Sequence, residues 1–270
     1  MIRFLILAGY FELTMYLQLS GKLNQYINIH YSYLAYISMV LSFILAIIQL
    51  IIWMKKMKMH SHLKGIWVKL SSPLILVLPV MVGLLVPTVA LNSTTVSAKG
   101  YSFPLAAGSS GGTSADGTTV QYLKPDTSAY FTSSAYKAEM QKEIKPYLRK
   151  DKIEITTENY MEVMELIYLY PDRFVGKTIT YTGFVYNDTN QKDHQFLFRF
   201  GIIHCIADSG VYGLSTRGNK QHYENNTWIQ ATGTIHIEYN QALKQSLPVL
   251  EMSKCQQVTK PDNPYVYRVF

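Results

Sequence analysis

The chain has 270 residues, of which 48% are hydrophobic and 16% are charged, and its formal net charge is +7. This apolar content excludes a wholly disordered chain and allows one large domain or two small ones. A positive charge can indicate a polyanion partner, but residues 1–119 carry +6 of the +7, and residues 120–270 are nearly neutral. The cations therefore have to be explained within the first part of the chain.

Three apolar runs within residues 1–91 predict an α-helical membrane region. The run 33–54 holds 22 residues without a charge, and about 20 apolar residues are enough to cross a bilayer as a helix. The run 74–91 is also uncharged and contains two prolines, which membrane helices tolerate. The run 2–19 is near spanning length although it contains Glu12. We therefore predict three spans, and the lipid bilayer as the first partner of this multi-pass chain.

The distribution of lysines predicts how these spans are oriented. Five lysines and no acidic residue lie between the second and third runs, whereas the loop between the first two runs holds only Lys22. Short cytoplasmic loops retain Lys and Arg, and translocated loops do not. We therefore predict a cytoplasmic N-terminus and an extracytoplasmic location for everything after residue 91.

Glu12 is the only acidic residue in a predicted span. A carboxylate inside a bilayer is costly, and this favours a functional or partner-facing role. Three structural alternatives remain open at this point. Glu12 could be protonated, could hydrogen-bond to Gln49 of the second span, or could lie on an interfacial helix that does not cross the membrane.

A polar segment separates the membrane region from the rest of the chain. Of the 28 residues in 92–119, 16 are Gly, Ser or Thr, a composition that buries little surface and orders poorly. We predict that this segment is a flexible linker, and that residues 120–270 form a separate extracytoplasmic domain.

The outer domain shows helical periodicity first and strand periodicity afterwards. A short helix is expected at 133–145, and a second one is expected from its N-cap Thr157 to Pro171, with Glu158, Glu162 and Glu165 as solvated surface acids. Alternating apolar residues then predict five strands, at 177–186, 195–205, 211–216, 228–238 and 247–258.

These elements predict the fold class, which is three membrane helices followed by a mainly-β domain. The central glycines Gly183 and Gly233 suit strands that bend sharply, as in a Greek-key barrel of the OB type with a preceding helix. A β-sandwich is the alternative. OB-folds often bind nucleic acid, but we expect no nucleic-acid partner because this domain is nearly neutral and is expected outside the cytoplasm.

The end of the second predicted strand holds the candidate metal ligands His204, Cys205 and Asp208. Cysteine with histidine would suit a zinc-like ion, so this is the cofactor that the sequence suggests. Adjacent residues on a regular strand point to opposite faces, however, so His204 and Cys205 could share one ion only if the strand breaks there. The structural alternative is a buried cysteine beside an aspartate that caps a turn.

Two further observations concern chemistry. Cys205 and Cys255 are the only cysteines, and they could form a disulfide outside the cytoplasm or could both be free and buried. The chain contains no G-x-S-x-G, H-E-x-x-H or Walker-type motif, so we expect a protein that is not an enzyme.

Several short runs of the sequence are informative together: Tyr31 to Leu34, Pro171 to Lys177, Gly183 to Tyr186, Arg199-Phe200, Cys205, Ala207-Asp208 and Asn263 to Tyr267. These runs resemble the YcgQ-like family of bacterial membrane proteins, which has no established biochemical activity. In many relatives two adjacent cysteines precede a short Ala-Asp step, and this chain has His204 in the first of these places. Within the candidate site, this difference favours a metal over a redox role, because His can replace Cys as a zinc ligand but not in a disulfide.

The resemblance implies a location in the bacterial cell membrane and a gene that commonly accompanies one for a predicted permease. We therefore expect a membrane-anchored accessory subunit of that permease, with an extracytoplasmic binding domain. The alternative is an extracytoplasmic metal- or thiol-dependent enzyme that uses His204, Cys205 and Asp208.

Overall fold

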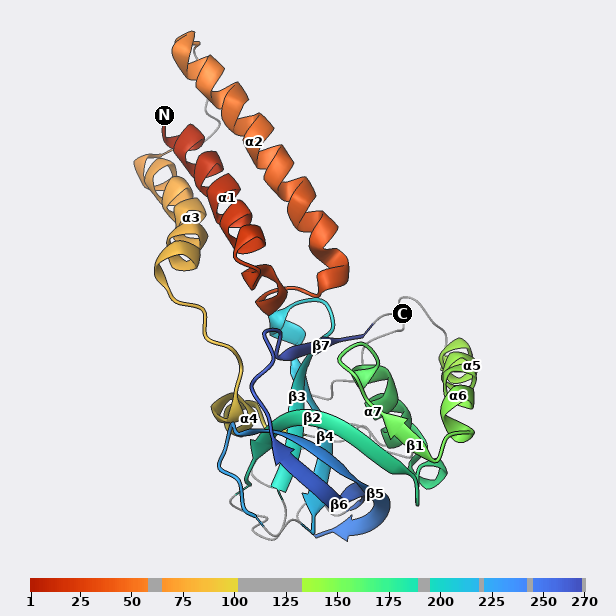
Figure 1. Ribbon diagram of the computed structural model, residues 1–270. Coiled ribbons are helices and arrows are strands. Elements are labelled where there is room, and N and C mark those ends of the chain that lie inside the picture. Colours follow the sequence, from red (N-terminus) through yellow and green to blue (C-terminus); the bar gives the residue numbers. More distant parts are fainter. Residues whose placement is uncertain (58–64, 102–132, 189–194, 219–220, 242–244, 269–270) are drawn as a thin grey trace. The chain divides into compact units, whose positions relative to one another are not determined.

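The structure is a computed structural model that describes residues 1–57, 65–101, 133–188, 195–218, 221–241 and 245–268 (Figure 1). By its internal contacts the chain divides into two compact units, Met1–Ala90 and Leu91–Phe270. Each unit is described by itself below.

The first unit is a group of three long helices. α1 packs against both of the others: the rings of Phe11 and Phe43 lie 5.1 Å apart, and the Tyr10 hydroxyl donates a hydrogen bond of 3.0 Å to the Leu76 carbonyl. Gly9 allows close packing against α3, because a Cβ atom at Gly9 would lie 3.0 Å from Val80. The helices are α1 (Ile2–Leu19), α2 (Ser32–Met54) and α3 (Ile66–Leu85), with the short turns η1 (Lys22–Gln25) and η2 (Ile29–Tyr31) between α1 and α2.

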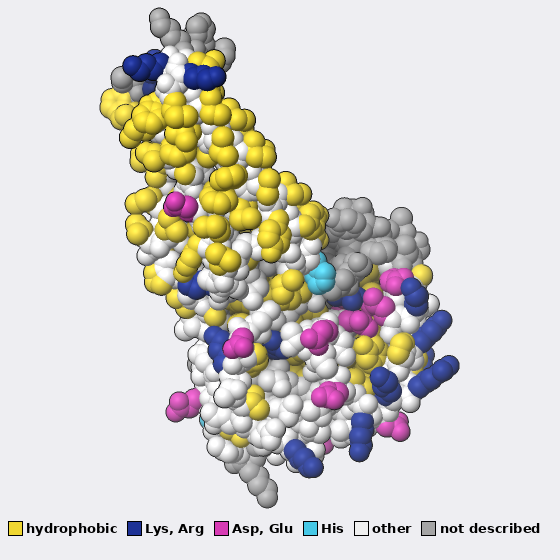
Figure 2. Space-filling view, turned by 45° about the horizontal axis from the view of Figure 1, so that its top comes forward, with side chains coloured by type: hydrophobic (Ala, Val, Ile, Leu, Met, Phe, Trp, Pro, Cys, Tyr) yellow, Lys and Arg dark blue, Asp and Glu magenta, His cyan; other side chains and the backbone are white. Residues whose placement is uncertain are grey.

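These helices are long and apolar enough to cross a membrane, over Ile2–Leu19, Ile29–Met54 and Trp67–Leu85. Hydrophobic side chains cover their surface (Figure 2), and such a surface is stable when lipid rather than water surrounds it. The prediction of three membrane helices is therefore confirmed at the level of length and composition, and the chain is a membrane protein.

The bounds predicted for the third span, 74–91, were wrong. The helix begins eight residues earlier and includes Lys69, because a charge close to a helix end does not break the helix and its long side chain can reach the interface. It ends at Leu85, and Val86 is extended, because a residue that precedes a proline disfavours the helical conformation.

The second unit is built on a closed five-stranded β-barrel, which is consistent with an OB-like fold. Around the barrel the strands follow the order β2, β5, β6, β4, β3, and the pairing of β3 with β2 closes it. β4 and β6 pair in parallel, and the other barrel pairs are antiparallel. The barrel strands are β2 (Thr178–Tyr186), β3 (Gln195–Ile202), β4 (Gly210–Arg217), β5 (Trp228–Asn240) and β6 (Gln245–Gln257).

Two short strands extend this sheet beyond the five that the sequence predicts. β1 (Lys152–Glu154) pairs in parallel with β2, and β7 (Tyr265–Tyr267) pairs in parallel with β3. Gly233 stands at a register shift between β5 and β6, where a Cβ atom would lie 2.3 Å from the Glu251 carbonyl oxygen. This close approach explains why a glycine stands at the register shift, while the sharp bends expected at Gly183 and Gly233 stay a prediction.

α7 (Tyr160–Leu169) is the central helix of the second unit, and most of its residues are buried. Its tyrosines bond to the barrel backbone, with 3.0 Å from the Tyr160 hydroxyl to the Tyr212 carbonyl and 2.6 Å from the Tyr168 hydroxyl to the Gly213 carbonyl. Thr157 is not its N-cap, because the helix starts after Asn159. The shorter helical elements are α5 (Ser133–Glu143), α6 (Lys145–Leu148), η4 (Pro171–Arg173) and η5 (Ile206–Asp208).

Residues 91–101, which we call the strap, lie on the barrel instead of forming the start of a flexible linker. They include the helix α4 (Ser93–Lys99), in which the side chain of Val96 is only 1% exposed. The ring of Tyr101 packs 4.8 Å from the ring of Phe196, and its hydroxyl donates a hydrogen bond of 2.6 Å to Asp188. The linker prediction therefore does not hold for residues 93–99, and residues 102–119 lie outside the described part of the chain.

Candidate functional site

The candidate metal ligands lie in the turn that joins β3 to β4. β3 ends at Ile202, before His204 and Cys205, so these two residues are not on a regular strand. The 3-10 turn η5 then brings Asp208 back towards them. Nδ1 of His204 lies 2.8 Å from Oδ2 of Asp208. The structure thus provides the break in the strand that a shared site would require, and it brings His204 and Asp208 together.

The Asp208 carboxylate is already occupied by donors from the same turn. The backbone N–H of His204 donates to it at 2.9 Å, and the backbone N–H of Cys205 donates at 2.9 Å. The Cys205 side chain in turn accepts a hydrogen bond from the backbone N–H of Asp208, which completes a capping box. This arrangement is that of an aspartate that closes a turn.

A metal ion would need further ligands at this turn. Within the described ranges of the chain, no group of three His, Cys, Asp or Glu side chains is arranged to hold a metal ion. His204 and Asp208 are about half and one-third exposed, respectively, so neither side chain is held rigidly in a closed pocket. The geometry gives no support to a zinc-like cofactor, and the assignment of His204, Cys205 and Asp208 as ligands stays a prediction.

Both cysteines are free thiols. Cys255 lies on β6, opposite Ala231 of β5, whereas Cys205 lies in the β3–β4 turn. Burial raises the pKa of the Cys255 thiol, while a hydrogen bond with Tyr223 acts in the opposite direction. A thiol with a raised pKa is a poor nucleophile at neutral pH, and this argues against a thiol-dependent reaction at Cys255.

Glu12 lies on the outer face of α1, exposed beside apolar side chains. Its carboxylate has no hydrogen-bond or ion-pair partner among the residues that the structure describes. Gln49 does not approach Glu12. It lines a pocket together with Arg3 at the N-terminal start of α1. The hydrogen bond between Glu12 and Gln49 that the sequence left open is therefore absent from the described structure.

Sequence reasoning missed a buried charged cluster in the second unit. Arg268, at 5% exposure, donates to Glu165 at 2.9 Å and to Glu143 at 2.7 Å, and the Tyr136 hydroxyl also bonds to Glu165. Burial alone would lower the pKa of Arg268, but the two carboxylates raise it. The prediction that Glu165 is a solvated surface acid was wrong, and its partner, 103 positions further along the chain, left no local signal.

A second buried cation, Arg199, holds the end of the chain against the barrel. Its guanidinium donates to the carbonyls of Asn263, Pro264 and Tyr265 and to the hydroxyl of Thr157, and it also lies over the rings of Tyr160 and Trp228. Burial lowers its pKa from the ordinary arginine value. Because every nitrogen of this side chain has a partner and three of its four bonds go to residues 263–265, Arg199 fixes β7 in place.

Comparison with known proteins covers almost the whole chain. The DUF1980 N-terminal domain matches residues 2–102, and the DUF1980 C-terminal domain matches residues 130–268. A protein of Streptococcus mutans named "Putative two-component membrane permease complex subunit" is 69% identical over 271 residues, with 100% of both chains covered. The "UPF0703 protein YcgQ" of Bacillus subtilis is 34% identical over 290 residues, again with 100% of both chains covered. No solved structure matches the chain.

Proposed function

Because this chain belongs to the DUF1980 family over both of that family's domains, we propose that it is the membrane-anchored, non-enzymatic subunit of a permease complex. The observation that carries this proposal is the end-to-end similarity, at 69% identity, to the Streptococcus mutans protein whose name assigns it to such a complex. The alignment covers 100% of both chains, so the similarity includes the membrane helices and the barrel. Surfaces that contact a partner in one protein can therefore be present in the other.

The membrane unit supports the proposal because it leaves surface for a partner. α1 packs against α2 and α3, and the remaining face of α1 carries the exposed Glu12. A carboxylate exposed within a bilayer is costly, and a neighbouring protein that pairs with it would offset this cost. Three helices with few polar positions also provide little material for a transport path of their own, since transport sites need interior polar groups.

The outer barrel is proposed as a binding domain that lies outside the cytoplasm. Five lysines between residues 55 and 69 support this orientation, because they favour a cytoplasmic location for the connection between α2 and α3. In the barrel, the candidate residues His204, Cys205 and Asp208 are used for turn closure, which supports a binding rather than a catalytic role.

The test is co-purification with the permease that the family resemblance implies, encoded beside this protein's gene. The two proteins are co-expressed, the present chain carries the tag, and the complex is extracted in mild detergent. We expect both chains to elute together in a fixed ratio. If the permease is absent from the eluate although both proteins are present in the membrane, the proposal is wrong.

Glu12 provides a sharper prediction for the same complex. Replacing it by leucine (Glu12→Leu) removes the charge that a partner would neutralise, and we expect at least a fivefold loss of co-purified permease. The Glu12→Gln variant should retain more of the partner, because an amide can still hydrogen-bond within the membrane. The matched control is Met15→Leu, an exposed apolar position on the same helix, which should bind as the wild type does.

The orientation has its own test, with reporters fused after Lys58 and after Gly112. Alkaline phosphatase is active only outside the cytoplasm, and green fluorescent protein folds best inside it. We expect fluorescence for the fusion after Lys58 and phosphatase activity for the fusion after Gly112. The opposite pattern would place the barrel in the cytoplasm and would refute the proposed orientation without affecting the association with a permease.

A further inference from the structure

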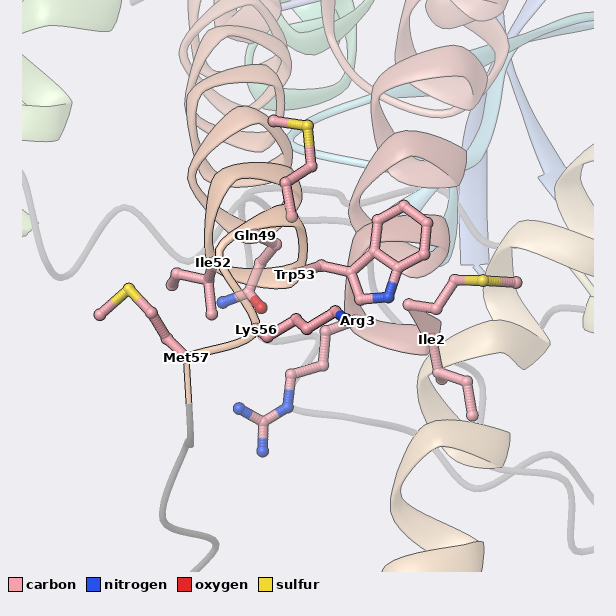
Figure 3. Close-up of a pocket in the computed structure, with 9 residues that line it drawn as sticks. Ile2, Arg3, Gln49, Ile52, Trp53, Lys56 and Met57 are labelled. Atoms are coloured by element: carbon pink, nitrogen blue, oxygen red, sulfur yellow. The ribbon is translucent and has the colours of Figure 1, made fainter.

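A pocket of about 830 Å³ opens at one end of the membrane unit, between the start of α1 and the end of α2 (Figure 3). Its polar side chains come from both helices: Arg3 from the first turn of α1, and Gln49, Trp53 and Lys56 from the last turns of α2 and just beyond. Figure 3 shows Gln49, Trp53 and Lys56 at the end of α2 and Arg3 at the start of α1, with their side chains around the pocket.

The charge of this pocket is positive and is not balanced within the unit. Arg3 and Lys56 line it, and no acidic residue does. Glu12 is the only acid in residues 1–90, and it lies about two and a half turns further along α1 than Arg3 does. Neither cation forms an ion pair with any residue that the structure describes. A guanidinium and an ammonium group that line one pocket suit a phosphate group, which arginine binds through two parallel hydrogen bonds.

The remaining walls of the pocket are apolar. Ile2 and Ile52 line it together with several methionines, and Trp53 is 51% exposed beside them. A free inorganic anion would gain nothing from such walls, whereas a phospholipid carries a phosphate and acyl chains in one molecule. A tryptophan at this position is typical of the membrane interface, where its ring lies at headgroup level.

The position of the pocket indicates that the bound lipid is anionic. Lys and Arg side chains gather at this end of the helical unit (Figure 2), and the proposed orientation places this end at the cytoplasmic surface. Anionic phospholipids give that surface its negative potential, and basic pockets between membrane helices on that side bind anionic headgroups.

We propose that this pocket binds one anionic phospholipid, with the phosphate between Arg3 and Lys56 and an acyl chain along Ile2 and Ile52. Gln49 donates from its amide to the headgroup, and the Trp53 ring packs against the glycerol region. The choice of an anionic lipid rests on the proposed orientation, whereas the site itself belongs to the helical unit alone and does not depend on the association with a permease.

The first experiment uses Trp53 as the probe. The full-length protein with Trp67→Phe is placed in phosphatidylcholine bilayers that contain phosphatidylglycerol brominated near the headgroup. Trp228 is buried in the barrel and is not accessible to the lipid, so the quenching reports on Trp53. We expect stronger quenching by brominated phosphatidylglycerol than by brominated phosphatidylcholine at the same mole fraction. Equal quenching by the two lipids, or no quenching by either, would overturn the proposal, and the second result would indicate a protein occupant.

The second experiment removes one cation at a time. In Arg3→Gln and in Lys56→Gln, we expect the mole fraction of brominated phosphatidylglycerol at half-maximal quenching to rise about fivefold, the ratio that corresponds to about 1 kcal/mol per basic residue at a membrane surface. Lys69→Gln is the matched control, since it removes the same charge from the same end of the unit but does not line the pocket.

Two outcomes of this second experiment would contradict the site. If Lys69→Gln shifts the curve as much as Lys56→Gln does, the lipid responds only to diffuse surface charge. If inorganic phosphate at millimolar concentration abolishes the preference for phosphatidylglycerol, and chloride at the same ionic strength does not, the pocket takes free phosphate and the lipid assignment is wrong.

Discussion

Arg268 shows how strongly a single buried residue connects distant parts of the second unit. Its guanidinium lies between Glu165 on α7 and Glu143 on α5, and it follows β7 by one residue. A buried ion pair adds little to the net stability of a fold, but removing one partner leaves an uncompensated charge and costs about 3–5 kcal/mol. The cluster therefore determines how α5 and the end of the chain are held against α7.

The Glu165→Leu variant tests this cluster. Arg268 keeps Glu143 as a partner, so we expect a loss at the lower end of that range, about 3 kcal/mol of unfolding free energy. Urea denaturation of the detergent-solubilised chain, followed by near-ultraviolet circular dichroism, measures the change. Glu139→Gln is the control, because Glu139 forms an exposed ion pair with Lys142 and such pairs contribute little. If both variants unfold at the wild-type midpoint, the buried pair does not hold these elements together.

Glu162, on the same helix, predicts a dependence of stability on pH. Partial burial raises the pKa of Glu162, although a hydrogen bond from Tyr147 opposes the shift. A carboxyl group whose pKa is raised on folding binds more protons in the folded state than in the unfolded state. Its contribution is therefore most favourable below the unfolded pKa of 4.5 and is lost as the pH rises through the folded value.

We therefore expect Glu162→Gln to raise the thermal unfolding midpoint at pH 7 and to leave it nearly unchanged at pH 4. Melting curves at these two pH values measure the effect, and they should be recorded in the same detergent. A variant that is less stable than the wild type at pH 7 would show that the hydrogen bond with Tyr147 outweighs the cost of burying the charge.

Residue types predicted some of these details and not others. Gly233 could be assigned to an irregular strand position, because only a residue without a side chain fits where two backbones approach so closely. The turn around Asp208 was foreseen as one of two alternatives. The burial of Glu165 and Arg199 could not be foreseen, because their partners come from parts of the chain that no local pattern connects to them.

At the scale of elements, regular periodicity accounts for what was predicted. The five barrel strands have apolar residues at the alternating spacing of a strand, and α7 has them at the spacing of a helix. The structure confirms the predicted bounds of these elements within a few residues. The short strands β1 and β7 have three residues each, too few for a period to be visible. The length of β3 was overestimated for a related reason: the apolar pattern continues to Ile203, but the chain turns after Ile202 to form the Asp208 cap.

The helix α4 was missed because its composition is that of a linker. Five of its seven residues are Ser, Thr or Ala, and its apolar contact with the barrel is made by Val96. Residues outside the strap hold it in place by hydrogen bonds. The Tyr265 hydroxyl accepts from the backbone N–H of Leu91 at 3.0 Å, and the Asn226 side chain accepts from the backbone N–H of Ser93 at 2.8 Å. The composition of residues 92–119 describes the strap alone and carries no information about the barrel residues that bind it.

At the scale of the whole molecule, the strap changes which part of the chain connects the two units. α3 ends at Leu85 and the second unit begins at Leu91, so five residues, 86–90, join them. The Gly/Ser-rich residues 102–119 come after the strap and before α5. Both flanks of residues 102–132, Tyr101 and α5, belong to the second unit, and this stretch is thus an internal connection of that unit.

A cut in this connection provides the test. A protease site is inserted after Gly112 in the full-length protein, which is cleaved in detergent after purification. We expect the N-terminal fragment and the barrel fragment to elute together, because the strap remains bound to the barrel. In a variant with Val96→Asp and Tyr101→Ala, a buried carboxylate and a lost aromatic contact should each cost about 3 kcal/mol, and the cut fragments should separate. Separation of the cut wild-type fragments would show that the strap does not hold.

The borders of the two family domains acquire a physical meaning from this arrangement. The first domain ends at residue 102 and so contains the strap, while the second begins at residue 130, just before α5. A gene split between these borders would encode a membrane fragment that carries the strap and a barrel fragment that lacks it. The chain is thus suited to fragment complementation, in which two separately expressed polypeptides rebuild one protein and the recovery of the barrel reports that they have met.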